Sequence, residues 1–430
     1  MRTMKDSGIE WIGDIPADWN IKRVKAVLCE RNESNNPIQT DEILSLTNDR
    51  GVIPYEEKGD VGNKSKEDLT GYKLAYPGDI VLNSMNVFIG SVGLSSYFGC
   101  VSPVYYMLYP RNKNDTVSFF NYLFQTKELQ TKLHGYGNGI MEIRMRIQMS
   151  KLNSVQLPVP PSDVQHKIAA YLDRKCSQID AIMARQKEVI EKLKAYKLSV
   201  ITEAVTKGLN PNVPMKDSGI DFIGSIPETW RICRLRNIGT LQNGISKGGE
   251  FFGHGFPFVS YGDVYRNFSL PVQVAGLIDS SDEERRNYSV ESGDIFFTRT
   301  SETIEEVGFS SVCEETIPDA TFAGFLIRVR PFTDDLISRF AKYYFRSNHH
   351  RYYLVKQMNL VTRASLGQDL LKSMPVLVPP KEEQTSIAAY LDKKCGAIES
   401  SIEYKQRVIE RLTAYKKSLI YEVVTGKKEV

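Results

Sequence analysis

Features of disulfide-bonded, membrane-spanning and secreted proteins are scarce in this chain. Its 430 residues include six cysteines and no CxxC pair, which favours a reducing compartment over a disulfide scaffold. No run of 18 or more apolar residues occurs, so no membrane-spanning helix is expected. The first residues, MRTMKDSGIE, reach acidic side chains and glycine before any apolar stretch, which argues against a signal peptide. We therefore expect a cytoplasmic protein that does not bind a membrane.

Motifs of catalytic and cofactor-binding sites are missing as well. The chain has neither a GxxxxGK[ST] loop nor an NPPY-type tetrapeptide. The glycines of Gly135–Gly139 follow a predicted helix rather than a strand, unlike a dinucleotide-binding loop. The five histidines show no HxxxH or Cys–His spacing typical of zinc sites. Exposed loop charge explains Asp41, Glu56 and Lys58 better than a metal-nuclease site does. We predict no catalytic, cofactor-binding or metal-binding residue on this chain.

What the chain does have is an internal duplication. The segment Met4–Trp19 returns as Met215–Trp230 with eleven of sixteen positions identical. A longer block, Val159–Asp180, returns as Val378–Glu399. The distance between matching positions drifts from 211 to 219 residues, so small insertions separate two copies of one plan. The order along the chain is module, helix, module, helix.

Each repeated block starts a long helix with a heptad stripe of apolar residues. Prolines precede each helix, and Gly208 and Gly426 end them after about 45 residues. The first helix leads into the second module and the second helix leaves it, so burial of the two stripes against each other requires an antiparallel pair. The predicted seam comprises Ile179, Met183, Gln186, Ile190, Leu193, Ile398, Ile402, Lys405, Ile409 and Leu412. Gln186 and Lys405 either set the register as a polar layer or extend to solvent.

The modules are predicted to mix strands and helices. Short β-branched and aromatic runs predict strands at Asp79–Ser84, Val104–Tyr109, Asp294–Thr300 and Phe325–Arg330. Helical spacing predicts helices at Ser118–Leu133 and Leu336–Leu354. We predict an α+β fold of two pseudo-repeated modules, related by a pseudo-twofold axis and joined by two long antiparallel coiled-coil helices. The boundaries are 1–157 for the first module, 158–214 for the first helix and linker, 215–376 for the second module and 377–430 for the second helix.

The repeated motifs resemble those of one known family. The GIxWIGxIPxxW opening, the VPPxxxQxxIAAYLDxK helix start and the TKGLNPNVPMKDSG junction are similar to those of the specificity subunit of type I restriction-modification systems. The resemblance covers essentially the whole chain. It implies that each module is a target recognition domain reading one half of a bipartite, asymmetric sequence in double-stranded DNA. It also implies that the helices set the spacing between the half-sites and dock two methyltransferase subunits, which restriction/translocase subunits then join.

The same resemblance implies a non-catalytic chain, with S-adenosylmethionine, ATP and Mg²⁺ bound by the partner subunits. A net charge of only +3 agrees with dependence on partners, because neutralising phosphates supplies most non-specific affinity for DNA. A self-contained nuclease or methyltransferase is the alternative, although the missing motifs and the duplication count against it. A pure coiled-coil scaffold would not need two different modules.

Candidate DNA contacts lie where the two copies diverge. Residues 299–303 are polar and follow a predicted strand, whereas the matching positions 84–88 differ. Arginine suits guanine edges and phosphates, and loops on a shared scaffold can carry different specificities. Arg144 and Arg363 match between the copies, so they suit phosphate contact or structure better than base reading. The candidates are Arg299, Thr300, Ser301, Glu302, Thr303, Asn243, Lys247, Tyr261, Tyr265, Arg266, Arg363, Arg50, Tyr55, Asn83, Ser84, Asn86 and Arg144.

Overall fold

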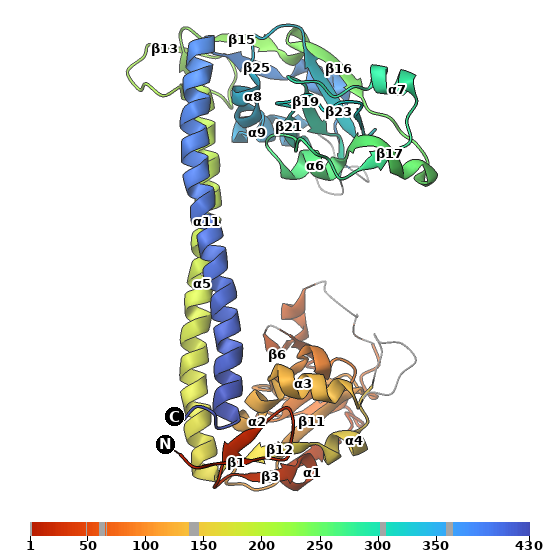
Figure 1. Ribbon diagram of the computed structural model, residues 1–430, viewed down its shortest axis with the longest axis vertical. Coiled ribbons are helices and arrows are strands. Elements are labelled where there is room, and N and C mark those ends of the chain that lie inside the picture. The colour runs from red at the N-terminus through yellow and green to blue at the C-terminus, as the bar shows by residue number, and fades with distance from the viewer. Residues whose placement is uncertain are drawn as a thin grey trace. The chain divides into compact units, whose positions relative to one another are not determined.

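The computed structural model describes residues 2–48, 50–59, 65, 67–136, 146–301, 307–357 and 364–430. The chain divides into two compact units. The N-terminal unit comprises Met1–Gln186 and Gln406–Val430, and the central unit comprises Lys187–Lys405. Each unit combines one module of strands and short helices with part of both long helices (Figure 1).

A four-stranded antiparallel sheet lies at the centre of the N-terminal unit. Its strands follow the order β4, β11, β8, β9 (Leu28–Arg31, Tyr105–Pro110, Ile80–Asn83 and Val92–Leu94). Because side chains alternate along a strand, Ile80 and Leu82 face a core shared with helices α2 (Val117–Phe124) and α3 (Lys127–His134). Val81 and Met107 belong to a second, smaller core. The inner strands are therefore buried on both faces.

That smaller core is covered by a second layer of short elements. They are β5 (Leu44–Thr47), β6 (Gly51–Pro54), the 3₁₀ helix η1 (Tyr55–Lys58), β7 (Lys73–Ala75) and β10 (Gly99–Val101). β5 pairs with β6 and β7 pairs with β10, both antiparallel. This layer comes from the part of the sequence in which the two copies show no obvious match.

The central unit repeats the sheet in the same order. Its strands are β16, β23, β19 and β21 (Gly239–Asn243, Leu326–Pro331, Ile295–Thr298 and Ser310–Val312). Ile295 and Phe297 share a core with α8 (Ser338–Tyr344) and α9 (Asn348–Gln357), while Phe296 belongs to a second core. The identical order confirms the duplication that the sequence predicts.

The second layer of the central unit is built differently. Strand β17 (Phe252–Val259) pairs with β18 (Leu277–Ile278) and runs parallel to β22 (Thr321–Phe322). Three short helices accompany these strands: η4 (Gly249–Phe251), α6 (Tyr261–Arg266) and α7 (Asp282–Asn287). A shared frame thus carries a different second layer in each unit.

The repeated entry segments form small two-stranded sheets in both units. The pairs are β1–β2 (Met4–Asp6, Asp14–Pro16), β3–β12 (Asn20–Arg23, Gln156–Val159), β13–β14 (Met215–Asp217, Ser225–Pro227) and β15–β25 (Arg231–Arg234, Pro375–Val378). Trp19 and Trp230 are each 1% exposed, so both pack inside their units. The remaining short elements are α1 (Val24–Val27), η2 (Val87–Ile89), α4 (Met149–Ser154), η3 (Leu235–Asn237), β20 (Thr300–Ser301), β24 (Ala364–Ser365) and α10 (Gln368–Ser373).

The two long helices, α5 (Ser162–Lys207) and α11 (Lys381–Val424), pack together and confirm the predicted fold class. In the N-terminal unit, Lys416 Nζ lies 2.7 Å from Asp180 Oδ2, and Thr413 Oγ1 lies 3.4 Å from Met183 Sδ. Residue numbers rise along one helix as they fall along the other, so the helices are antiparallel there. Lys197 and Glu399 form an ion pair between the same helices in the central unit. Among the described residues, no helix has the length and apolar character needed to cross a membrane.

The predicted seam residues differ in burial. Ile179, Ile190, Ile398 and Ile409 are buried, whereas the other seam positions are half-buried. Gln186 and Lys405 lie where the two units meet in the chain. Their predicted register role therefore stays a prediction.

Two predicted helices are each divided in the structure, which corrects the sequence-based expectation. The segment Ser118–Leu133 is interrupted at Thr126, which has extended dihedrals (φ −71°, ψ 136°) and starts α3. Its buried hydroxyl donates to the Leu123 carbonyl at 2.7 Å. Such local side-chain bonds compete with continuation of a helix. The segment Leu336–Leu354 divides likewise into α8 and α9.

A buried histidine lies just after the second of these interruptions. His350 is 4% exposed, and its Nδ1 lies 3.0 Å from Ser347 Oγ. Its ring meets the Tyr344 ring edge-on at 4.2 Å and the Phe345 ring at 5.2 Å. Burial, helped by repulsion from His349, lowers the pKa of His350 to about 3. The folded protein therefore keeps this imidazole neutral.

Because the pKa of His350 is lowered in the folded chain, we expect the protein to lose stability in mild acid. Below a pH of about 6.5, His350 binds a proton in the unfolded chain, whereas in the folded chain it stays neutral. The free energy of unfolding should therefore fall as the pH drops from about 6.5 toward 3, by up to about 1.4 kcal/mol per pH unit. Urea unfolding at pH 7 and pH 5 measures this difference. It should shrink in His350→Phe and persist in His254→Asn, which changes an exposed histidine. An unchanged difference in His350→Phe would contradict the assignment.

Candidate nucleic-acid interface

In the central unit, the predicted loop after β19 is joined to a second segment. β20 pairs antiparallel with β24, so that Thr300 lies opposite Ser365. The Arg299 carbonyl accepts a hydrogen bond from the Leu366 amide at 2.7 Å. The Arg299 side chain is half-exposed. Of the other candidates, Ser301 lies in β20, and Glu302, Thr303 and Arg363 lie outside the described residues.

The N-terminal unit makes the same connection after β8. The Ser84 carbonyl accepts from the Ile147 amide at 2.9 Å, in the position that Arg299 and Leu366 occupy in the central unit. Ser84 is fully buried, and its hydroxyl donates to the Val104 carbonyl at 2.6 Å. The Asn83 side chain accepts from the Met85 amide at 3.0 Å. These two side chains shape the turn, whereas Asn86 is half-exposed. The candidate Arg144 lies outside the described residues.

Two further candidates of the N-terminal unit lie in its second layer. Arg50 follows β5, is exposed and donates to the Glu57 carbonyl at 2.7 Å. Tyr55 begins η1, and its hydroxyl accepts from the Ser65 amide at 3.0 Å. Asp41 and Glu56 are exposed. Within the described part of the chain, no group of three or more His, Cys, Asp or Glu residues could hold a metal ion.

Helix α6 gathers three candidates of the central unit. It begins with a capping box, in which Ser260 and Asp263 bond each other's backbone amides. The Tyr261 and Tyr265 rings are stacked at 5.9 Å with an interplanar angle of 18°. The Tyr265 ring also lies 4.9 Å from that of Phe309. Arg266 is exposed at the end of the helix. Aromatic and guanidinium groups together suit contacts with bases and phosphates.

Asn243 and Lys247 are engaged inside the central unit. The Lys247 ammonium donates at 2.7 Å to both the Asp279 carbonyl and Glu284 Oε2. The hydrogen bond from Lys247, together with the Ser281 amide, lowers the pKa of Glu284. Asn243 Oδ1 accepts from Gln368 Nε2 at 3.0 Å and so links β16 to α10. Both side chains therefore stabilise the scaffold around the candidate face.

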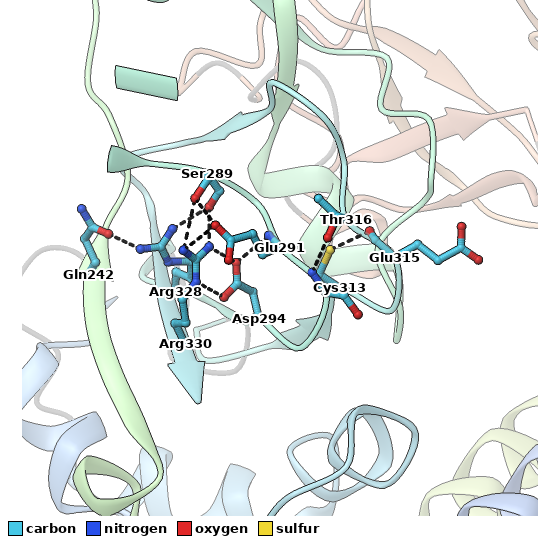
Figure 2. A network of polar contacts seen from close by, with 10 residues as sticks. Gln242, Ser289, Glu291, Asp294, Cys313, Glu315, Thr316, Arg328 and Arg330 are labelled. Carbon is cyan, nitrogen blue, oxygen red and sulfur yellow. Dashed lines mark hydrogen bonds and ion pairs between the residues drawn. The ribbon is translucent and has the colours of Figure 1, made fainter. Parts of the chain in front are cut away.

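A buried carboxylate fixes the turn that leads into β19 (Figure 2). The Asp294 side chain is 1% exposed and accepts two hydrogen bonds from Arg330, at 2.7 and 2.6 Å. It also accepts from the Glu291 amide at 2.8 Å. The bond to Asp294 raises the pKa of Arg330, whereas burial lowers the pKa of Arg328 beside it. Because Asp294 precedes β19 directly, this network positions the strand that ends at Thr298, just before Arg299.

The N-terminal unit keeps the aspartate but takes its arginine from another strand. Arg31 of β4 donates to Asp79 Oδ2 at 2.9 Å and lies over the Tyr109 ring at 4.9 Å. Tyr109 has the place in β11 that Arg330 has in β23. Burial raises the pKa of Asp79 despite the bonds from Arg31 and the Tyr76 amide. Both units thus fix the same turn by different pairs.

One residue of this region, Arg346, was not identified as a candidate from the sequence. Arg346 connects α8 to α9 and donates hydrogen bonds to carbonyl groups at the end of α6. The region around it was predicted to be one continuous helix, which conceals the turn that directs this side chain inward. The signal for it in the sequence is an arginine directly after three consecutive aromatic residues, Tyr343–Phe345.

Comparison with known proteins identifies the family. The family model described as type I restriction modification DNA specificity domain matches residues 16–192 and again residues 227–411. The chain is 23% identical to the putative type I restriction enzyme MjaX specificity subunit of Methanocaldococcus jannaschii, over 97% of this chain and 96% of the relative. It is also 23% identical to the type I restriction enzyme EcoKI specificity subunit of Escherichia coli, over 65% of this chain and 59% of that relative.

Solved structures share the fold. One is a chain from work on complex assembly and conformational transition of the type I R-M system (TM-score 0.73, 14% identity, 96% of this chain and 99% of that chain). Another is the HsdS subunit from Thermoanaerobacter tengcongensis (TM-score 0.52, 14% identity, 96% and 98% covered). The family match sets aside the alternative of a self-contained DNA-modifying enzyme. Because one family model matches both copies of the duplication, the chain belongs to the type I restriction-modification specificity family and is a non-catalytic DNA specificity subunit.

Proposed function

We propose that each module reads one half of a bipartite, asymmetric DNA target and that α5 and α11 hold the two readers at a set spacing. The observation that carries this proposal is a shared sheet order combined with different second layers in the two units. A common frame directs both modules to DNA in the same manner, and different surface layers recognise different bases. The proposed recognition domains are residues 1–157 and 215–376, and the proposed spacer segments are 158–214 and 377–430.

The proposal extends to the partners. Two methyltransferase subunits dock on the long helices, and restriction/translocase subunits join that complex in the cytoplasm. S-adenosylmethionine, ATP and Mg²⁺ then belong to those partners. The family match and the absence of nucleotide-loop motifs from the sequence support this division of labour.

Co-expression with a type I methyltransferase subunit tests the proposal. Methylome sequencing of such a host should reveal adenine methylation at one split, non-palindromic site with a constant gap. Neither protein alone should produce it, and the two proteins should co-purify. Methylation by the chain alone, or at a continuous palindrome, would overturn the proposal.

A further inference from the structure

The C-terminal end of α6 is held by one buried arginine. Arg346 is 9% exposed. Its Nη2 donates to three carbonyl oxygens that belong to the end of α6 and the residue after it, and its Nε donates to a fourth carbonyl on β21. The acceptors and distances are Val264 (2.7 Å), Tyr265 (3.0 Å), Asn267 (2.7 Å) and Ser310 (2.6 Å).

This arrangement supplies what a short helix lacks. Helices of six residues are not stable by themselves, and their last carbonyl groups have no partner within the helix. A cation at the C-terminal end satisfies those carbonyls and also complements the helix dipole. The capping box at Ser260 serves the other end. Both ends of α6 are therefore fastened, and Arg346 ties it to the frame helices α8 and α9.

The guanidinium of Arg346 has no carboxylate partner in the described part of the chain. It lies 5.0 Å from the Phe268 ring and 4.9 Å from the Phe309 ring. A buried charge is costly unless hydrogen bonds compensate for it, and here carbonyl dipoles and aromatic faces do so. Burial lowers the pKa of Arg346 to about 10, so the side chain remains charged at neutral pH. Lysine could not reproduce the planar set of donors.

The same contacts lead to the candidate DNA-reading side chains. The guanidinium carbons of Arg346 and Arg351 lie 4.9 and 4.7 Å from the centre of the Phe309 ring. Tyr265 rests on Phe309, and Tyr261 stacks on Tyr265. A shift of Arg346 would therefore move both tyrosines of α6.

The N-terminal unit has a different residue at this place. Tyr122 of α2 and Tyr343 of α8 each donate to an aspartate of a long helix, at 2.7 and 2.8 Å. Three residues after each tyrosine stand Gln125 and Arg346. The second layer of the N-terminal unit contains strands and η1 where the central unit has α6, within the described residues. Among the described residues, arginine therefore occupies this position in the unit that contains α6, and glutamine occupies it in the other unit.

We propose that Arg346 is a positioning residue for DNA reading by the central unit. It holds α6 in one geometry, so that Tyr261, Tyr265 and Arg266 meet the same bases or phosphates at every binding event. This inference rests on the proposed function, because it presumes that the central unit reads one half-site.

Two variants and a matched control test the inference in the full chain. Arg346→Lys and Arg346→Met remove the fork of donors. Arg328→Lys changes another buried arginine of the same unit, which donates to the Ser289 carbonyl at 2.5 Å and to Gln242. Hydrogen exchange of residues 261–267 is measured on the free chain. Base preference is measured with the methyltransferase partner on a library randomised at both half-sites.

In both Arg346 variants, we expect residues 261–267 to exchange at least about tenfold faster, which corresponds to about 1.4 kcal/mol. Discrimination at one half-site should fall about tenfold, with the other half-site unchanged and Arg346→Lys less affected than Arg346→Met. Arg328→Lys should keep the wild-type preferences.

Two results would overturn the inference. In one, α6 loses protection while the base preferences stay intact. In the other, Arg328→Lys alters the same preferences as the Arg346 variants, which would indicate a general loss of stability. Absence of split-site methylation by the wild-type complex would instead refute the proposed function. The hydrogen-exchange measurement is made on the free chain, so its result does not depend on methylation.

Discussion

Replacing Arg299 by alanine should reduce base discrimination at one half-site by about 10- to 100-fold and leave the other half-site intact. Arg299 lies between β19 and β20, its backbone is bonded to Leu366, and its side chain is half-exposed. A bidentate arginine–guanine contact contributes about 1–3 kcal/mol of discrimination. Methylation of a randomised split-site library, read by sequencing, measures the effect.

Two further variants complete this experiment: one distinguishes a base contact from a phosphate contact, and the other is the control. Arg299→Lys keeps the charge but loses the planar fork, so a base contact predicts a loss close to that of alanine and a phosphate contact predicts a small one. Arg231→Ala removes an exposed arginine that pairs with Asp335 at 2.9 Å, and it should leave the specificity unchanged. If Arg299→Ala retains the wild-type preferences at every position, Arg299 does not read DNA.

Replacing Gln384 by leucine should destabilise the central unit by about 3–5 kcal/mol. The glutamine of the repeated VPPxxxQ motif is fully buried at the start of α11. It accepts from the Ile337 amide at 2.9 Å and donates to the Asp335 and Pro379 carbonyls at 2.7 and 2.8 Å. Leucine has a similar size but leaves these backbone groups unpaired, at about 1–3 kcal/mol for each buried group. Urea unfolding followed by circular dichroism measures the change.

An exposed glutamine of the same helix provides the control. Gln406→Leu should change the free energy of unfolding by less than about 0.5 kcal/mol. In the N-terminal unit, Gln165 accepts from the Thr116 amide at 3.3 Å and donates to the Pro160 carbonyl at 3.1 Å. Gln165→Leu should therefore have an effect similar to that of Gln384→Leu. Equal stability of Gln384→Leu and Gln406→Leu would show that the motif glutamine does not stabilise the junction.

The frame of each unit could be predicted because its elements follow local rules. The predicted strands at Asp79–Ser84 and Val104–Tyr109 contain β8 and overlap nearly all of β11. The long helices follow from heptad periodicity over some 45 residues, a signal that single substitutions do not hide. Helix interruptions at Thr126 and before Asn348 could not be predicted, because tertiary hydrogen bonds and burial decide them.

The candidate site was only partly accessible to the same reasoning. Polar residues after a strand suggest a surface loop, yet Ser84 is buried and bonded to Val104, and Lys247 is paired with Glu284. The sequence shows that a side chain is polar, but it does not show whether that side chain already forms a hydrogen bond with a backbone carbonyl group. The contacts of Arg346 join segments about 80 residues apart in the sequence. Periodicity predicts local elements, but it does not predict contacts between segments so far apart.

The differing arginine partners of the two buried aspartates limit how such chains can recombine. A chimera that joined β16, with Gln242, to β11, with Tyr109, would leave the aspartate without a guanidinium partner. The reverse crossover would supply both Arg31 and Arg330 to one carboxylate and place two half-buried positive charges beside each other. Exchange of whole modules within the repeated helix segments keeps each pair together. Inheritance of new specificities should therefore proceed by entire modules, with breakpoints outside the sheet.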